Sequence, residues 1–261
     1  MAGIVHWDQI TSGSADYGMG RRLLMGELSA VCRAAAISGA QEILVNDAHA
    51  TMRNIDPEEP LERSRILTGH LKPMYMMEGL DESFDAAIFL GYHGPIGSAS
   101  VLSHSYSPAI IWEARINGRV TGETGLNAMV AHYYGVPVVM ITGDDRTVDD
   151  AAGWIPEARG VAVKASITRF SASSLTAAEA VELIFDSTQK ALEEIGQPPA
   201  DAPATVELTF QSADMAVLAG WVPGVERTGE RTIRFRGETG LEAYRLFVMV
   251  LFLARSAVDI R

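Results

Sequence analysis

The sequence predicts an α/β fold of two domains, in which a mainly parallel sheet flanked by helices is joined to a smaller α+β C-terminal domain. Two observations predict it. Short apolar runs alternate with helical patterns along residues 1–196, which is typical of parallel strands connected by helices. The proline-rich segment QPPADAPA at 197–204 then marks a linker, and strand and helix patterns resume at 205–261. We expect this short tail to pack on the first domain, because it is small for independent stability.

The first elements follow from apolar spacing. A helix is expected from about Tyr17 to Gly39, where apolar residues recur every three or four positions. Apolar runs at 42–45 and 85–90 predict buried strands, each with a polar exit loop. Residues 110–120 predict a β-hairpin that turns at Asn117-Gly118.

The remaining elements have clear boundaries. A helix is expected over Glu123–Tyr134, before Gly135, and a buried strand at 137–142. The long amphipathic helix at 176–195 starts with a capping box formed by Thr176 and Glu179. In the tail we expect strands at 205–210 and 231–236, with helices at 212–219 and 241–258.

Composition excludes several classes of protein. The 261 residues include 21 Lys and Arg against 33 Asp and Glu, a net charge of −12 that disfavours nucleic-acid binding. The single cysteine, Cys32, excludes an internal disulfide and a cysteine-based zinc site. The N-terminus lacks the pattern of a signal peptide, and the apolar run at 246–254 is too short to span a membrane. We therefore expect a cytoplasmic protein with no membrane partner.

Candidate site residues lie where predicted strands end. Ligands of open α/β sheets bind beyond the carboxyl ends of the strands, and His49 and His93 each close an apolar strand. Glu123 begins the helix at 123–134. Two imidazoles and one carboxylate suit a catalytic zinc ion. The spacing alone also fits structural histidines and a carboxylate at a helix N-terminus, because no short-range pair such as HExxH is present.

Two further polar positions have alternative interpretations. His104, in a serine-rich loop, fits a catalytic base or transition-state donor, and it equally fits a serine-bonded loop histidine. Asp144 and Asp145 follow a predicted strand, and helix capping is preferred for them over catalysis. Neither a phosphate-binding GxxxxGK[ST] loop nor a GxSxG nucleophile motif occurs.

Six sequence blocks together resemble one known family. They are LVNDAH (44–49), MMEGLD (76–81), FLGYHG (89–94), LSHS (102–105), GETGLNA (122–128) and ITGDDR (141–146). In order and spacing they resemble the zinc-dependent D-aminopeptidases of the DppA type. The resemblance implies a hydrolase that binds two zinc ions, removes the N-terminal residue from short D-amino-acid peptides and assembles into a ring-shaped homo-oligomer. It places His49, His93 and Glu123 at metal-ligand positions and His104 at the position of the catalytic histidine, all within the expected catalytic domain at 1–196.

One motif of that family is not found in the sequence. The family begins with a strand that ends in Asp-x-Glu-Gly, whose two carboxylates are zinc ligands, and the segment AGIVHWDQ (2–9) resembles the residues just after it. We expect that the natural chain starts upstream of Met1. The alternatives are a truncated, metal-poor homologue that acts as a structural or peptide-binding oligomer, and a related metal-dependent amidase.

Overall fold

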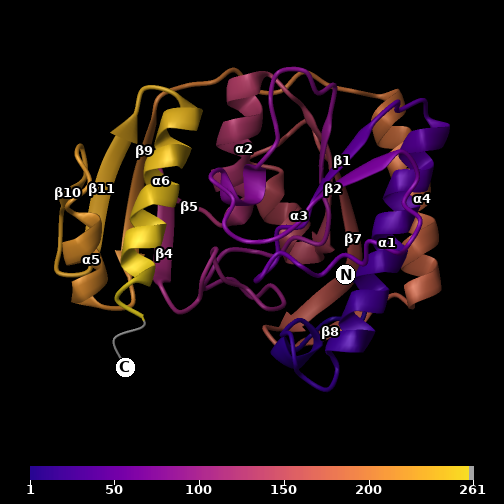
Figure 1. Ribbon diagram of the computed structural model, residues 1–261, viewed down its shortest axis with the longest axis horizontal. Helices are drawn as coiled ribbons and strands as arrows, with labels where there is room; N and C mark the ends of the chain where they lie inside the picture. The colour runs from indigo at the N-terminus through magenta and orange to yellow at the C-terminus, as the bar shows by residue number, and fades with distance from the viewer. Residues whose placement is uncertain (259–261) are drawn as a thin grey trace.

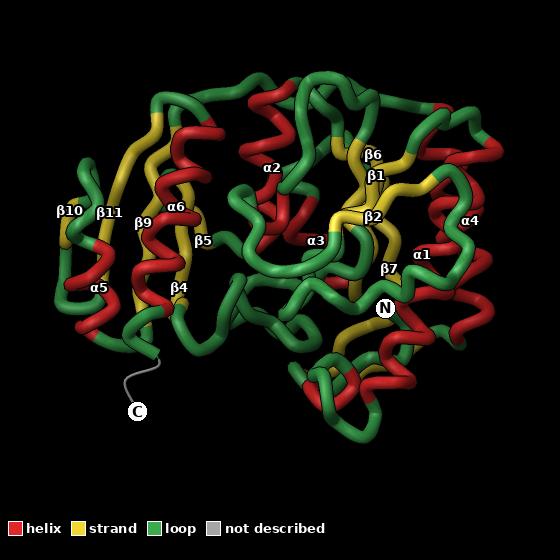
Figure 2. The backbone as a smooth tube through the Cα atoms, viewed as in Figure 1, coloured by secondary structure: helices red, strands yellow, loops and turns green. Residues whose placement is uncertain are grey.

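Three sheets and six α-helices make up the part of the chain that the structure, a computed structural model, describes: residues 1–258 (Figure 1). The predicted α/β class is therefore confirmed. Helices α5 and α6 lie at one end of the molecule, and α1 and α4 lie side by side at the other (Figure 1). Long connections run from β2 to β3, with η2 between them, and from β3 to β4. Loops are drawn green in Figure 2.

The elements follow one another in this order. The first half contains η1 (Trp7–Gln9), α1 (Tyr17–Ile37), β1 (Ile43–Asn46), β2 (Ser64–Leu67), η2 (Tyr75–Met77), β3 (Ala87–Phe89), β4 (Ile111–Ile116), β5 (Arg119–Val120) and α2 (Glu123–Tyr134). The second half contains β6 (Val138–Asp144), α3 (Asp145–Ala151), β7 (Arg159–Thr168), β8 (Ser171–Ser174), α4 (Ala177–Glu193), β9 (Ala204–Phe210), α5 (Ala213–Ala219), β10 (Glu226–Arg227), β11 (Thr232–Gly237) and α6 (Gly240–Arg255).

The four-stranded sheet has the order β3-β6-β7-β8, and its first three strands are parallel. All seven residues of β6 are buried. Val139 and Met140 pack in the core cluster that includes α1 and α4, whereas Val138 and Ile141 pack in the cluster that includes α2. Because both faces of β6 are covered, its sequence reads as a continuous apolar run, as predicted.

Strands β1 and β2 form a separate parallel pair, and a large cavity lies between β1 and β3. This cavity, of about 1660 Å³, is lined by residues of both strands. Within residues 1–258, no strand pairs with the edges of β1 and β3 that border it. The predicted burial of the apolar runs at 42–45 and 85–90 is therefore wrong in part. All of β1 is only half-buried, and in β3 Phe89 alone is buried, because the cavity leaves one side of each strand uncovered.

The five-stranded sheet has the order β10-β11-β9-β4-β5, and all its pairings are antiparallel. Helices α5 and α6 pack on it. Its hairpin β4–β5 comes from the middle of the chain and turns at Asn117 (φ 50°) and Gly118 (φ 81°), as predicted. The pairing of β9 with β4 joins the C-terminal tail to the preceding part of the chain. The division into domains 1–196 and 205–261 stays a prediction.

Helix ends confirm three local predictions. Thr176 and Glu179 form the capping box of α4. Gly135 ends α2 with φ 67°, in the left-handed region that glycine favours. Asp144 caps α3, with its carboxylate accepting from the Thr147 N–H at 2.8 Å. Among the described helices, none is long and apolar enough to cross a membrane.

Candidate metal centre

Three side chains that are distant in sequence converge at one edge of the large cavity. They are His93, in the loop after β3, His104, in the loop before β4, and Glu123, the first residue of α2. Their possible ligand atoms all lie within 4.8 Å of one another. We call this group the His93–His104–Glu123 cluster. It is the one group of this kind among the described residues.

Each imidazole presents Nε2 to the carboxylate. The distance is 3.2 Å from His93 Nε2 to Glu123 Oε2 and 3.6 Å from His104 Nε2 to Glu123 Oε1. The other ring nitrogen of each lies against a backbone carbonyl: His93 Nδ1 is 3.1 Å from the oxygen of Gly94, and His104 Nδ1 is 2.7 Å from that of Leu102. An Nδ1–H donated to a carbonyl fixes the ring and leaves Nε2 for a metal or a proton.

Charge interactions in the cluster set its protonation. Burial alone would raise the pKa of Glu123, but the charge and hydrogen bond of His93, followed by His104, lower that pKa to about 2. Burial would lower the pKa of His93, and Glu123 raises it overall. Burial and the neighbouring His93 lower the pKa of His104 to about 4. At neutral pH, Glu123 is therefore a carboxylate and His104 a neutral imidazole.

The donor set and spacing of the cluster fit a zinc ion. Zinc takes imidazole nitrogen and carboxylate oxygen at about 2.0–2.2 Å in tetrahedral geometry, which puts neighbouring ligand atoms roughly 3.3 Å apart. The two separations from Glu123, 3.2 and 3.6 Å, are close to this spacing. Two histidines and one glutamate also match a known ligand set of catalytic zinc sites.

A buried hydrogen-bond network holds Glu123 in place. The Tyr106 N–H donates to Glu123 Oε1 at 2.9 Å. The Tyr106 hydroxyl bonds to Asn127 Oδ1 and lies 2.9 Å from the Tyr244 hydroxyl, which donates to the Met74 carbonyl at 3.0 Å. Tyr106 is not among the site residues that the sequence predicts. Its place two residues after His104 is the one signal that points to it.

His49 lies apart from the cluster. It is exposed on the loop after β1, and its Nε2 is 2.9 Å from the Ile10 carbonyl oxygen. It lines the same large cavity as His93, His104 and Glu123. The buried carboxylate of Asp47 fixes this loop by accepting from the Ile55 N–H at 2.9 Å and the side chain of Asn54 at 2.8 Å. Asp47 therefore acts within its own loop, as a strand-exit turn residue does.

Trp7 covers the cluster at the cavity edge. Its ring meets that of His104 edge-on, with centroids 5.4 Å apart. Arg169 lies over the indole at 5.5 Å from its centroid, and it donates to the Ser103 carbonyl at 3.1 Å. The N-terminal segment thus shields one side of His104 from water.

A family match, a relative in sequence and a solved structure agree on what this chain is similar to. Residues 1–249 match the peptidase family M55, described as D-aminopeptidase. The D-aminopeptidase of Bacillus subtilis (strain 168) is 39% identical over 254 residues, which are 94% of this chain and 90% of that protein. A solved structure, described as the Zn-dependent D-aminopeptidase DppA from Bacillus subtilis, a self-compartmentalizing protease, superimposes with a TM-score of 0.90. It is 35% identical, and the match covers 97% of this chain and 94% of the other.

Proposed function

Since this chain belongs to the M55 family of D-aminopeptidases, we propose that it is a zinc-dependent aminopeptidase that hydrolyses the N-terminal residue from short peptides of D-amino acids. The observation that carries the proposal is the convergence of His93, His104 and Glu123 at the edge of one large cavity. A charged set of possible ligands that lines a cavity is what a metallopeptidase requires.

We assign the metal to His93 and Glu123 of the cluster, with His49, which lies apart from it, as the further ligand that the family resemblance implies. His93 and Glu123 present Nε2 and Oε2 at ligand spacing, and His49 faces the same cavity from the loop after β1. A bound zinc ion supplies Lewis-acid chemistry: it makes water a better nucleophile near neutral pH and polarises a carbonyl group. The resemblance described above implies two zinc ions.

We assign proton transfer to His104. Its neutral Nε2 can take a proton from attacking water and return it to the leaving amine, since Nδ1 is occupied by the Leu102 carbonyl. His104 is buried, and the ring of Trp7 lies edge-on against its imidazole. The distance of 3.6 Å to Glu123 Oε1 also lies within ligand range, so the metal content of a His104 variant decides between proton transfer and metal binding.

We also propose that the chain forms a ring-shaped homo-oligomer. The structural relative is described as a self-compartmentalizing protease. Large apolar side chains are exposed on the single chain, including Trp221 at 73%, Ile167 at 66% and Trp112 at 55%. Contact with other copies of the chain would cover such side chains. Light scattering on the eluting protein measures the mass, and a monomer would contradict this part of the proposal.

The test of the proposed activity is hydrolysis of D-Ala-D-Ala and L-Ala-L-Ala by zinc-loaded and chelator-treated protein. We expect zinc-dependent release of D-alanine and much slower release of L-alanine. A protein that binds no zinc and hydrolyses neither peptide would support the structural or peptide-binding alternative. Zinc-dependent hydrolysis restricted to other amides would support the amidase alternative.

A further inference from the structure

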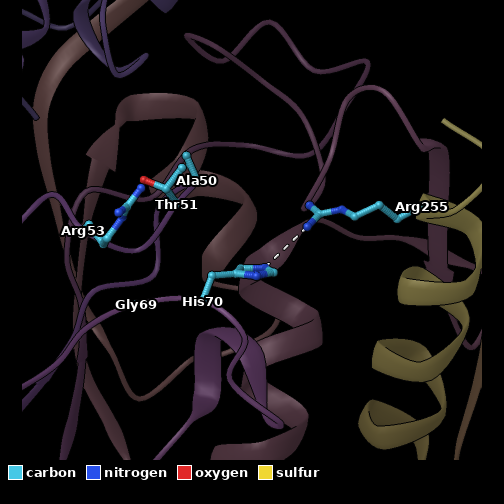
Figure 3. Close-up of a pocket in the computed structure, with 6 residues that line it drawn as sticks. All are labelled: Ala50, Thr51, Arg53, Gly69, His70 and Arg255. Carbon is cyan, nitrogen blue, oxygen red and sulfur yellow. Dashed lines mark hydrogen bonds between the residues drawn. The ribbon is translucent and has the colours of Figure 1, made fainter. Parts of the chain in front are cut away.

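A smaller cavity of about 380 Å³ opens beside the large one (Figure 3). It is lined by Ala50, Thr51, Arg53, Gly69, His70 and Arg255, and we call it the arginine pocket. Three of these residues, Ala50, Thr51 and Arg255, also line the large cavity that holds His93, His104 and Glu123. The two cavities are therefore neighbours, and Ala50, which lines both, directly follows His49 in the chain.

The side chains of the arginine pocket come from three separate segments. Arg53 belongs to the loop after β1, His70 to the loop after β2 and Arg255 to the last turn of α6. Figure 3 shows the guanidinium of Arg255 reaching His70, which lies between Arg53 and Arg255 in this view. Arg255 Nη1 is 3.4 Å from His70 Nε2, so His70 accepts a hydrogen bond and orients the guanidinium.

The arginine pocket is cationic on an acidic protein. Two of its six lining residues are arginines and none is acidic, although the whole chain has a net charge of −12. Within residues 1–258, neither Arg53 nor Arg255 takes part in an ion pair. Burial, Arg255 and Lys72 lower the pKa of His70, which agrees with a positive potential in this region.

We propose that the arginine pocket binds the C-terminal carboxylate of the short peptide substrate, with Arg255 and Arg53 as the residues that recognise it. The inference rests on the proposed function, because that activity supplies a peptide whose N-terminus is held at the metal ligands. Guanidinium groups match carboxylates in geometry and bind them by charge-assisted hydrogen bonds. A site at fixed reach from the catalytic residues selects peptides by length, because an extended chain spans only about 3.3–3.6 Å per residue.

The kinetic test compares D-Ala-D-Ala with its C-terminal amide, which keeps the scissile bond and removes the negative charge. We expect the wild-type protein to prefer the acid by about tenfold or more in KM. Arg255→Gln should raise KM for the acid by a similar factor and leave the amide nearly unchanged, so the preference disappears. Arg53→Gln should also raise KM for the acid. The control is Arg245→Gln, an exposed arginine of the same helix outside the arginine pocket, which should keep the preference.

A binding test separates this inference from the proposed activity. If the wild-type protein hydrolyses neither compound, both stay intact and calorimetry measures their binding directly. If the acid binds more tightly than the amide, and Arg255→Gln abolishes this difference, the carboxylate site in the arginine pocket is supported even though the proposed activity is not. Equal binding of acid and amide, or an acid preference that survives both Arg255→Gln and Arg53→Gln in folded protein, would overturn it. Tight binding of inorganic phosphate that depends on Arg255, without an acid preference, would instead show a site for free anions and overturn the peptide assignment.

Discussion

The imidazole rings of His93 and His104 stack almost in parallel, with centroids 3.9 Å apart and an interplanar angle of 19°. Both rings point Nε2 at the same carboxylate, that of Glu123. Protonating both imidazoles at this distance is unfavourable, because like charges repel. The pKa values of the two rings accordingly move apart, that of His93 upward and that of His104 down to about 4. The two histidines therefore suit different functions within one cluster: metal binding for His93 and proton transfer for His104.

His104→Ala should lower turnover of D-Ala-D-Ala by about 10²–10⁴-fold while zinc stays bound, since general acid–base catalysis contributes on that order. Turnover and zinc content are measured on the same preparation. Unchanged turnover would contradict the catalytic role. Loss of zinc together with activity would show instead that His104 is a metal ligand.

Glu123→Gln should weaken zinc binding by at least about tenfold, because the amide removes the negative charge and one ligand oxygen. The Tyr106 N–H can still donate to the remaining amide oxygen, so the fold should survive. Competition with a zinc chelator measures the affinity. Glu113→Gln, in a half-exposed ion pair with Arg115 on β4, is the matched control and should bind zinc as the wild type does. Equal zinc affinity in Glu123→Gln would remove Glu123 from the ligand set.

Asp144 should make the protein's stability depend on acid pH. Burial would raise the pKa of this carboxyl, but hydrogen bonds from Thr147, Ser100 and Val101 lower it overall. A carboxyl whose pKa is lowered in the folded state stabilises the fold at pH values above its ordinary pKa. This stabilisation is lost as the pH falls below about 4. Asp144→Asn should therefore lower the free energy of unfolding at pH 7 by about 1–3 kcal/mol and flatten its decline below pH 4. Equal slopes for wild type and variant, measured by urea unfolding, would contradict this account.

Two glycines of α1 should respond in opposite directions to alanine. A Cβ at Gly20 would lie 1.7 Å from the Gln9 carbonyl oxygen, so Gly20→Ala must push α1 away from η1. A Cβ at Gly26 would make ordinary contact with Val181 Cγ2 at 3.5 Å. Gly26→Ala should raise stability by about 0.5–1 kcal/mol through helix propensity, and Gly20→Ala should lower it by more than about 1 kcal/mol. Thermal unfolding of both variants checks this, and a stabilising Gly20→Ala would contradict the close contact.

Local signals in the sequence explain which elements could be predicted. The capping box at Thr176, Gly135 after α2 and the Asn117-Gly118 turn each act within a few residues, and the structure confirms all three. Strands β2 and β7 were not predicted. Strand β2 is a four-residue SRIL segment, and polar residues interrupt β7, so partners distant in sequence stabilise both.

The sequence could predict which residues belong to the site, but not how they are arranged in space. His93, His104 and Glu123 could be identified from their places beside predicted elements and from the family resemblance. Their meeting depends on loops that cross between sheets, and the exposed position of His49 outside the cluster has no sequence signal. Tyr106 supports Glu123 from 17 residues away, a relation that only the folded chain reveals.

The most direct test of the central claim is anomalous diffraction at the zinc edge from crystals of the zinc-loaded protein. The account predicts an anomalous peak in contact with Nε2 of His93 and the carboxylate of Glu123. Zinc bound stoichiometrically elsewhere, with no peak at these two side chains, would contradict it.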